Sequence, residues 1–490
     1  MERNLINTLW ERFQALSWFP VFTEAIRDSK QPLFVVGGAV RDLILGREFD
    51  DLDIVAAGPL DETVQKLSLN LGVRAIPLGR FPKQVFRFVL PDLIIDLAPL
   101  EGDTIKTELA RRDLTINAMA LEFKPDQDQT EIIDPWGGLS DLREKKARFV
   151  SEAVILSDPL RLLRLFRFSA VLDLIPHPSS LALVIKHAPL IKKVAGERIR
   201  EELLKLLAVP SSHATIKIMM EHGLLTALIP EIKSLRGSLQ NVYHHLDVLD
   251  HTFLAFYYLE QIMAAPEKHF AAFDSKIRAY LSYGDRPALL KLAILLHDLG
   301  KPAARSEDKE GRIHFYKHEV IGAETAIRIV HRFRFSRAEE NYIRFIIRHH
   351  LQPFHLLTSE ASGKLRPKGI YRFGRLAGPD LWGLLIHALA DAMATQGPAS
   401  KDHRSIPGLL AFFDRLILEI AKQRDRNPKL LTGTDLITSF GLPSSPLIGR
   451  LLLSVEEAHA TGQIKNKSEA LTFVAELLEK NDNPNKLSIY

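Results

Sequence analysis

The chain has 490 residues, 46% of them hydrophobic and 25% charged, which is the composition of a globular protein and enough length for several domains. It contains no cysteine, so disulfides, thiolate metal sites and a cysteine nucleophile are excluded, and a reducing compartment is expected. The formal net charge of +4 is too small to indicate nucleic-acid binding by itself. We find neither a secretory signal pattern nor an apolar run long enough for a membrane span, and we expect a cytoplasmic protein with no membrane partner.

Hydrophobic periodicity divides the chain into five regions. Residues 1–30 predict an amphipathic helical extension. Residues 31–140 alternate short β-rich runs, such as LFVV and LIIDLAPL, with turn signals and two helical stretches, which predicts a small sheet domain. Beyond Ser140 the strands disappear, and we expect helices alone in residues 141–235, 236–400 and 401–490. The predicted fold class is therefore α+β and mostly helical.

Basic residues are concentrated just after the predicted sheet domain. Between Asp141 and Lys205 there are 13 Lys or Arg and 8 Asp or Glu. Such an excess suits a surface that follows a phosphate backbone. A solvated helical surface has the same appearance, and charge alone does not distinguish the two.

Two aspartates lie two residues apart on a predicted strand. Asp51 and Asp53 in DDLDIV leave the same face of the strand, because successive side chains alternate. Asp96 in LIIDLAPL belongs to a later strand that can pair alongside. Close carboxylates repel one another unless a cation lies between them, and Mg²⁺ prefers such oxygens. The three acids therefore predict a magnesium site of the kind used in phosphoryl or nucleotidyl transfer.

A glycine-rich turn precedes these acids. In FVVGGAVRDLILG a strand is followed by Gly37 and Gly38 and then by a predicted helix. The glycines permit close backbone approach, and the helix N-terminus presents free N–H groups to a phosphate. Arg41, one turn into this helix, can reach triphosphate oxygens. The alternative is a tight strand–helix turn with a surface arginine.

Five collinear motifs carry a family resemblance. GGAVRDLILG, DDLDIV, RRDLTINAMALE, DPWGGLSDL and DPLRLLRLFRF resemble, in order and spacing, the bacterial tRNA nucleotidyltransferase and poly(A) polymerase family. The resemblance implies a polymerase β-like nucleotidyltransferase head at 31–140, a neck and body that bind RNA and nucleotide at 141–235, and a helical tail at 401–490. It implies that Asp51 and Asp53 bind two Mg²⁺ ions, with Asp96 as a third catalytic acid. The nucleotide-binding residues that it implies are Gly37, Gly38, Arg41, Asp42, Arg111, Arg112, Asp113, Asn117, Asp158, Arg161 and Arg164.

Base choice in this family resembles templating by protein side chains. An E-D-x-x-R motif on the neck helix offers an Asp and an Arg to the base edge, and Ser157, Asp158 and Arg161 stand at these positions. One turn apart on a helix, Asp158 and Arg161 can recognise C or A together; without the resemblance, an ordinary salt bridge at a helix start is favoured. Ser157 departs from the usual Glu. The segment from Asp96 to Arg111 is also shorter than the mobile loop of CCA-adding members, which favours a CC-only or A-only enzyme.

A second constellation of histidines and aspartates occupies residues 236–400. Ten of the 18 histidines lie between His244 and His350. Each candidate lies in a predicted helical stretch, so distant residues can converge inside a helical bundle. Imidazole and carboxylate together suit Mn²⁺, Fe²⁺, Ni²⁺ or Zn²⁺. The candidate ligands are His251, His297, Asp298, His318, His349, His350 and Asp391.

The order H…HD…H…HH…D resembles the HD phosphohydrolase superfamily. The resemblance implies His251, His297, Asp298 and Asp391 as core ligands, with His318 and either His349 or His350 at a second ion. It implies hydrolysis of phosphate esters by a metal-bound water. HD units within tRNA nucleotidyltransferases resemble 2′,3′-cyclic phosphodiesterases and phosphatases. Lys301, on the same helix face as His297, can neutralise a phosphate, or it is a solvated lysine after a glycine C-cap.

The favoured function is addition of C, A or both, from CTP or ATP, to the 3′ acceptor end of tRNA, with a metal-dependent HD phosphohydrolase as a second activity. Poly(A) polymerase is the runner-up in this class. A protein that is chiefly a phosphohydrolase, with an RNA-binding head, is the alternative from a different class. A noncatalytic RNA-binding scaffold fits poorly with two complete ligand sets. The sequence leaves the oligomeric state open.

Overall fold

The computed structural model describes residues 11, 16, 19–26, 31–80, 84–123, 132–238, 246–395, 405–425 and 429–479. Most of the predicted extension at 1–30, His244 and the last residues of the chain lie outside the described residues. The chain forms two compact units, residues 1–230 and 231–490. Within the described ranges, no helix combines the length and the apolar character that crossing a bilayer requires.

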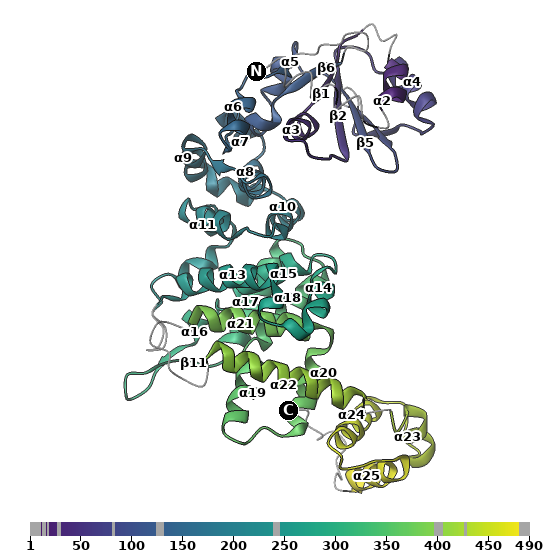
Figure 1. Ribbon diagram of the computed structural model, residues 1–490, viewed down its shortest axis with the longest axis vertical. Coiled ribbons are helices and arrows are strands. Elements are labelled where there is room, and N and C mark those ends of the chain that lie inside the picture. The colour runs from purple at the N-terminus through teal and green to yellow at the C-terminus, as the bar shows by residue number, and fades with distance from the viewer. Residues whose placement is uncertain are drawn as a thin grey trace. The chain divides into compact units, whose positions relative to one another are not determined.

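The first unit contains a mixed sheet of seven strands in the order β3-β4-β5-β2-β1-β6-β7 (Figure 1). The pairing of β2 with β5 is parallel, and the other pairings in this sheet are antiparallel. Strand β1 is buried along its whole length, as expected for a central apolar run. The strands are β1 (Leu33–Val36), β2 (Asp51–Ala56), β3 (Ile76–Leu78), β4 (Val85–Val89), β5 (Ile94–Pro99), β6 (Ala120–Phe123) and β7 (Ile132–Ile133).

Short helices flank and connect these strands. Helix α3 follows β1 through Gly37, whose positive φ of 80° makes a tight strand–helix turn. Helix α5 begins with a capping box between Thr104 and Thr107. The elements of this region are α2 (Phe19–Ile26), α3 (Gly38–Leu45), α4 (Asp61–Leu71), α5 (Ile105–Leu109), η1 (Thr115–Asn117) and α6 (Gly138–Arg143).

A helical region completes the first unit. In α8 the apolar residues Leu162, Leu165 and Phe166 recur at helical spacing and are buried. The arginines of the same segment are spaced by three residues and face α10 and the sheet region. The helices are α7 (Glu152–Ser157), α8 (Arg161–Leu172), α9 (Pro178–His187), η2 (Ala188–Lys193), α10 (Gly196–Ala208), α11 (His213–Glu221) and α12 (Leu224–Leu228), and η3 (Pro230–Leu235) leads into the second unit.

The second unit is a helical bundle. Helix α15 is buried at every position from Ala288 to Leu296, so it forms the centre around which α13, α17, α18 and α21 pack (Figure 1). The elements are α13 (Val248–Ala264), η4 (Pro266–Lys268), η5 (Ala271–Phe273), α14 (Asp274–Leu281), α15 (Arg286–Leu296), α16 (Lys301–Ala304), α17 (His318–Arg332), α18 (Arg337–His349), α19 (Gln352–Ala361), α20 (Pro367–Ala377), η6 (Gly378–Asp380) and α21 (Leu381–Thr395).

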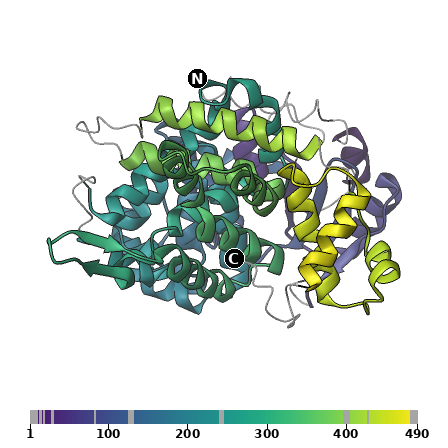
Figure 2. The ribbon, with the colours of Figure 1, turned by 90° about the horizontal axis from the view of Figure 1, so that it is seen from below.

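The C-terminal part of the second unit has an apolar core of its own. Helices α23 (Gly433–Phe440), α24 (Pro446–Ala460) and α25 (Lys467–Glu479) follow α22 (Ile406–Asp425). They pack around Leu436, Leu451 and Val474, and they are the yellow helices of Figure 2. In α24 the buried residues are three or four positions apart, which explains why this helix buries one face: Ile448, Leu451, Val455 and Ala458.

The expectation that no strands follow Ser140 was wrong. Two pairs occur there, β8 (Lys146–Ala147) with β9 (Ile175–Pro176), and β10 (Arg305–Glu307) with β11 (Ile313–Phe315). The second pair is a hairpin whose turn uses Gly311 at a φ of 77°, with Asp308 accepting hydrogen bonds from two backbone N–H groups. Its polar residues obscured the strand pattern, since both strands are short and partly exposed.

Candidate functional site

The three acids predicted from the sequence lie on one face of the sheet. Strands β2 and β5 are parallel, and Asp53 stands directly opposite Asp96 in the register. Asp51 precedes Asp53 by two residues and shares its face. Partial burial and the negative charges of Asp50, Asp53 and Asp96 raise the pKa of Asp51 above its ordinary value. Their oxygens are of the kind that a hard divalent cation such as Mg²⁺ prefers, although the three acids are not among the groups whose potential ligand atoms lie within 4.8 Å of one another in the described structure.

Two arginines engage these acids in the described structure. Arg87 of β4 donates from Nε and Nη2 to the two oxygens of Asp96, at 2.8 and 2.7 Å. Arg112 donates from Nη1 to Asp53 Oδ2 at 3.1 Å. Arg87 was missed by the sequence analysis, although an arginine inside the apolar run VFRFVL was a detectable signal. Each of these two acids therefore has a guanidinium partner in the described structure.

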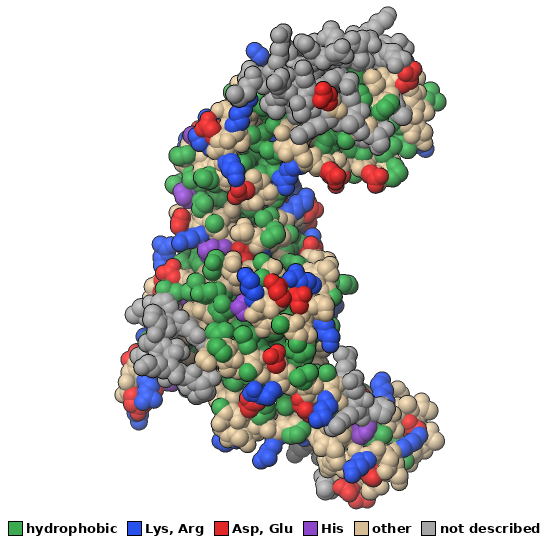
Figure 3. Space-filling view, viewed as in Figure 1, with side chains coloured by type: hydrophobic (Ala, Val, Ile, Leu, Met, Phe, Trp, Pro, Cys, Tyr) green, Lys and Arg blue, Asp and Glu red, His purple; other side chains and the backbone are tan. Residues whose placement is uncertain are grey.

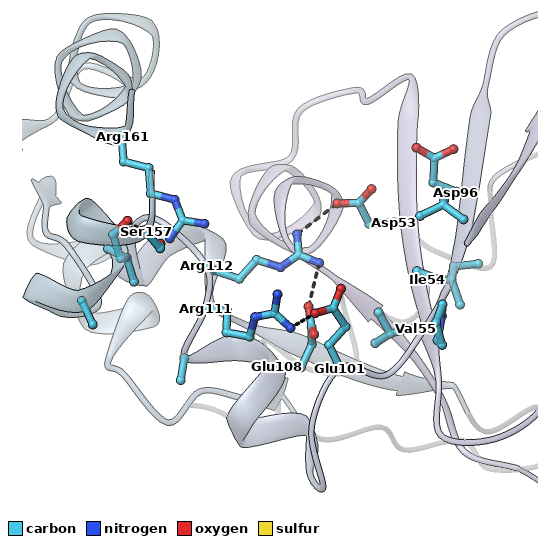
Figure 4. Close-up of a pocket in the computed structure, with 16 residues that line it drawn as sticks. Asp53, Ile54, Val55, Asp96, Glu101, Glu108, Arg111, Arg112, Ser157 and Arg161 are labelled. Carbon is cyan, nitrogen blue, oxygen red and sulfur yellow. Dashed lines mark hydrogen bonds and ion pairs between the residues drawn. The ribbon is translucent and has the colours of Figure 1, made fainter. Parts of the chain in front are cut away.

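A cavity of about 540 Å³ opens beside Asp53 and Asp96, a size in the range of small-molecule sites. Figure 4 shows Arg112 directed at Asp53, Arg111 at Glu101, and Arg161 entering from the helical region. Arg112 also lies 3.7 Å from Glu108. Of the predicted site residues, those that line this cavity are Asp53, Asp96, Arg111, Arg112, Ser157 and Arg161.

The glycine turn brings backbone close to this cavity. A Cβ atom on Gly37 would lie 2.7 Å from Arg112 Nη1 and 3.3 Å from Asp53 Oδ2, and its φ of 80° disfavours other residues. Gly38 is the first residue of α3. At Gly37 the turn therefore lets the backbone lie close to Arg112 and Asp53. Contact of this turn with phosphate stays a prediction.

Several predicted nucleotide-binding residues form a separate buried network. Arg41 donates to Asn117 Oδ1 at 2.6 Å and holds its neighbour Asp42 through two bonds, at 2.9 and 2.6 Å. Asp113 accepts from Asn117 at 3.0 Å and from Arg164 Nε at 2.7 Å. These five residues are not among those that line the cavity. In the structure these residues contact one another. Direct binding of nucleotide by them stays a prediction.

Charge compensation stabilises this network. Burial by itself raises the pKa of Asp113, but the charge of Arg164 and the hydrogen bonds from Asn117, Arg164 and the Leu114 backbone outweigh it and hold the pKa below its ordinary value. Arg164 in turn lies 3.6 Å from Glu202 of α10. The network joins η1, α3 and α8, which fixes the helical region against the sheet region within the first unit.

Asp158 and Arg161 do not share a helix, contrary to the expectation. Asp158 ends α7 and Arg161 begins α8, because Pro159 disfavours a helical conformation at the residue before it. Asp158 accepts from Arg198 at 3.2 and 2.7 Å, so the simple salt bridge to Arg161 is not formed. Arg161 Nη1 is buried and has no hydrogen-bond partner among the described residues. This donor is consequently available to a bound molecule.

The second predicted site is assembled at the ends of helices. His251 lies in α13 and Asp391 in α21, but His297 and Asp298 follow α15, and His318 begins α17. Their position at helix ends corrects the expectation that all candidates lie inside helices. Potential ligand atoms lie within 4.8 Å of one another in three overlapping buried groups: His251, His297 and Asp298; His297, His350 and Asp391; and Asp298, His318 and His350.

Backbone carbonyls orient three of these imidazoles. In each, Nδ1 lies close to the carbonyl oxygen three residues earlier: His297 at 2.7 Å, His318 at 2.8 Å and His350 at 2.6 Å. A carbonyl only accepts, so Nδ1 donates its proton and Nε2 keeps a lone pair. Such an outer hydrogen bond is the usual way in which a protein aims an imidazole at a metal. The donor set therefore fits a transition-metal ion.

The two aspartates of this cluster are held in their charged forms. Burial alone raises the pKa of Asp298, but the charges of His297, Lys301 and His251 outweigh it and keep the pKa well below its ordinary value. For Asp391, burial is likewise outweighed by the hydrogen bond and charge of His251, which lies 2.9 Å away, and the pKa is lowered. Anionic oxygens are the form in which aspartate binds a metal, and a bound ion would displace any proton from the imidazole nitrogen that coordinates it.

The structure distinguishes between His349 and His350. His350 is 1% exposed and belongs to two of the three ligand groups. His349 belongs to none of them, and its ring instead contacts Phe345 at 5.0 Å. Consecutive helical side chains point about 100° apart, so only one of the pair faces the cluster. The prediction of His349 as a ligand finds no support in this geometry.

Lys301 is not a solvated lysine. It is 8% exposed, and its Nζ lies 2.7 Å from Asp298 Oδ2. The ammonium also lies 5.8 Å from the centre of the Phe315 ring. The positive charge of Lys301 therefore lies at the edge of the metal-ligand cluster. Its expected action on a phosphate stays a prediction.

His387 was missed by the sequence analysis. It is buried in α21, four residues before Asp391 and therefore on the same helix face. Its ring centre lies 5.2 Å from that of His297 and 5.5 Å from that of His350. The spacing H-x-x-x-D in LIHALADA was the signal that could have identified it.

Close backbone contact places His318 beside the His–Asp pair. A Cβ on Gly300 would collide with the His318 carbonyl oxygen and lie 2.6 Å from the Gly322 nitrogen. We expect Gly300→Ala to push α17 outward, to lower the melting temperature and to weaken metal binding, with a cost of about 1–3 kcal/mol for overpacking. Thermal unfolding and metal titration measure both effects. Gly449→Ala is the control, since a Cβ there meets nothing within 4 Å; equal behaviour of the two variants would contradict the expectation.

Comparison with protein families covers most of the chain. Residues 33–80 and 91–148 match the poly A polymerase head domain, and residues 173–235 match a domain described as "Probable RNA and SrmB-binding site of polymerase A". Residues 248–394 match the HD domain, and residues 418–475 match tRNA nucleotidyltransferase domain 2. The cavity acids fall in the first match and the histidine cluster in the third.

Characterised relatives match over nearly their whole length. The A-adding tRNA nucleotidyltransferase of Deinococcus radiodurans is 30% identical over 452 residues, covering 91% of this chain and 95% of the relative. The CC-adding tRNA nucleotidyltransferase of Thermus thermophilus is 30% identical over 465 residues, covering 93% and 94%.

Solved structures share the fold. A Thermotoga maritima CCA-adding enzyme complexed with tRNA matches with a TM-score of 0.64 and 22% identity, over 96% of this chain and 98% of that chain. A CCA-adding enzyme in complex with CTP matches with a TM-score of 0.66 and 22% identity, over 98% of both chains. The predicted α+β class, with a sheet domain followed by helical domains, is confirmed. With the head, HD and tail matches in one chain and relatives of 30% identity along it, the protein belongs to the tRNA nucleotidyltransferase family.

Proposed function

We propose that the protein adds C, A or both, from CTP or ATP, to the 3′ acceptor end of tRNA. The observation that carries this proposal is the alignment of Asp51, Asp53 and Asp96 on one sheet face beside a cavity of about 540 Å³. The family supports the reaction class, and its A-adding and CC-adding members support the RNA end as acceptor.

The residues around this cavity have different roles in the transfer. The tRNA 3′-oxygen bonds to the α-phosphorus of the nucleotide, and the bond to pyrophosphate breaks. Asp51 and Asp53 would hold Mg²⁺, which neutralises phosphate charge and orients the attacking and leaving oxygens when bound. Arg111 and Arg112 line the cavity beside the acids and supply fixed positive charge for the triphosphate and the departing pyrophosphate.

Arg161 is the residue best placed to read the base. Its Nη1 is buried without a hydrogen-bond partner among the described residues, and the side chain lines the cavity. A guanidinium donates to the ring-nitrogen acceptors that C and A both present, and also to the carbonyl oxygen of C. Asp158 is oriented by Arg198, and a carboxylate accepts from the exocyclic amino group of C or A. C and A match this pair, with Arg161 as the donor and Asp158 as the acceptor. U and G do not, so the site is expected to discriminate against them.

The nature of the added sequence is tested with defined RNA ends. Protein, Mg²⁺ and labelled CTP or ATP are incubated with tRNA lacking CCA, tRNA lacking only the terminal A, or complete tRNA. Because the segment after Asp96 is short, we expect CC addition alone or A addition alone. Repeated A addition to complete tRNA would instead establish a poly(A) polymerase, and no labelled product from any substrate would refute the proposal.

Positively charged residues of η2 are expected to contact the tRNA backbone. Lys192 and Lys193 are exposed and have no ion pair among the described residues, although on the face seen in Figure 3 basic and acidic side chains are mixed. Replacing both by Ala should weaken tRNA binding roughly 10-fold and flatten the plot of log affinity against log salt by about 2.

Filter binding or fluorescence anisotropy across a salt series measures this effect. Lys186→Ala is the matched control, because Lys186 is exposed in the same region but lies 2.7 Å from Glu152. If the double variant keeps the full salt slope, these lysines do not contact phosphates.

We also propose that the histidine cluster is a metal-dependent phosphohydrolase centre. Its support is the three overlapping ligand groups and the three imidazoles whose Nε2 atoms are left free to coordinate. His251, His297, Asp298 and Asp391 would hold one ion, with His318 and His350 at a second. When bound there, Mn²⁺, Fe²⁺, Ni²⁺ or Zn²⁺ would supply the Lewis acidity that hydrolysis of a phosphate ester by water needs. Lys301, beside Asp298, supplies positive charge near the substrate phosphate.

The test of this second activity uses 2′,3′-cyclic nucleotides and nucleoside monophosphates with each of the four metals. The expected result is a nucleoside 2′- or 3′-phosphate from the cyclic nucleotides, or inorganic phosphate from the monophosphates. Metal bound without turnover of any phosphate ester would leave a structural metal site and overturn the hydrolase proposal.

A further inference from the structure

His387 is a fully buried histidine without visible compensation. Its exposed fraction is 0%, and neither Nδ1 nor Nε2 has a hydrogen-bond partner among the described residues. A neutral imidazole carries one donor and one acceptor. Burying both without partners is costly, and native proteins rarely do so unless an ion or a ligand completes the bonding. The position therefore needs an explanation beyond packing.

The surroundings of His387 point to the metal cluster. Its ring stands nearly perpendicular to that of His297, at 78°, with centres 5.2 Å apart, and at 53° to that of His350, with centres 5.5 Å apart. Both neighbours belong to the ligand groups. Asp391, one turn later on α21, belongs to them as well, and residues at i and i+4 share a helix face. The imidazole thus lies beside the rings of two cluster histidines, although its own nitrogens are in none of the three groups of atoms within 4.8 Å.

We propose that His387 is an additional nitrogen ligand of this metal centre, which rests on the metal centre proposed above. The ring differs from its neighbours in one respect. Backbone carbonyls hold the Nδ1 atoms of His297, His318 and His350, whereas His387 keeps both nitrogens uncommitted, so either one can coordinate. A further imidazole makes the donor set richer in nitrogen, which favours Ni²⁺, Zn²⁺ and Fe²⁺ over oxygen-seeking Mg²⁺.

His387→Leu tests the proposal by metal binding, without reference to activity. Leucine has a similar volume and no polar atom. We expect Ni²⁺ and Mn²⁺ to bind at least ~10-fold more weakly, by competition with a chelator and by metal analysis of the purified full chain. In the metal-free protein, the same change should raise the melting temperature, because it removes two buried unpaired nitrogens. A residue that only packs would show the higher melting temperature without any loss of metal affinity.

His349→Leu is the matched control, since His349 is adjacent to a cluster histidine in sequence but contacts Phe345; its metal affinity should equal that of the wild type. His387→Gln, which keeps a polar group without an imidazole, should also lose affinity and serves if the leucine variant fails to fold. Wild-type affinity in both folded His387 variants would overturn the inference and leave the metal centre intact. A wild-type chain that binds no ion would overturn the metal centre and the inference together.

Discussion

Asp53→Asn is expected to lower nucleotide incorporation by about 1000-fold, equivalent to about 4 kcal/mol of transition-state stabilisation. Asp53 lies between Asp51 on its own strand and Asp96 on β5. It also lines the cavity and contacts Arg112. The amide keeps the shape of the side chain but removes the charge that would hold Mg²⁺. Initial rates with labelled CTP and ATP at saturating Mg²⁺ measure the loss.

Asp50→Asn is the matched control for this substitution. Asp50 is an exposed acid immediately before β2, and its side chain is not among those that line the cavity. We expect its variant to retain rates within about threefold of the wild type, consistent with a surface change. If Asp53→Asn also retains activity while both variants unfold at the wild-type temperature, the sheet acids are not the catalytic centre.

His297→Asn is expected to reduce phosphate-ester hydrolysis by about 1000-fold and to lower the metal content, while tRNA nucleotide addition stays unchanged. The asparagine amide can still donate to the Ile294 carbonyl, as Nδ1 does at 2.7 Å, but no atom replaces Nε2. The change therefore deletes a ligand that belongs to two of the three groups with little alteration of the surrounding packing. Metal analysis and hydrolysis assays of the same preparation measure both effects.

The control for His297→Asn is His349→Asn, which should leave metal content and hydrolysis intact. Comparison of His297→Asn with Asp53→Asn also separates the two activities. A main activity that is lost in His297→Asn and kept in Asp53→Asn would favour a protein that is chiefly a phosphohydrolase.

Local patterns were enough to predict the sheet acids and the helical cores. Side chains alternate along a strand, so Asp51 and Asp53 share a face whatever the rest of the chain does. The buried faces of α8 and α24 follow from apolar spacing alone. The hairpin at 305–315 was missed because its strands are short and polar, so they lack the apolar alternation that marks a strand.

Partner choice could not be predicted from such patterns. Asp158 and Arg161 are three residues apart, yet Asp158 pairs with Arg198, which is 40 residues away. Pro159 ends the helix between them, and the approach of α10 supplies the partner. Arg87 likewise meets Asp96 only because β4 and β5 pair in the observed register. Contacts of this kind depend on which segments the fold brings together.

The amino-acid sequence by itself determined which residue types the protein has for its two centres: a strand with paired aspartates and a set of histidines and aspartates with metal-ligating chemistry. The tertiary structure decided which of them meet. It selected His350 over His349, placed the His387 ring beside that of His297, and turned Arg41 and Asn117 toward one another instead of toward the cavity. Residue chemistry and strand alternation are local properties, whereas the distance between two side chains far apart in the chain is set by the packing of whole helices and strands.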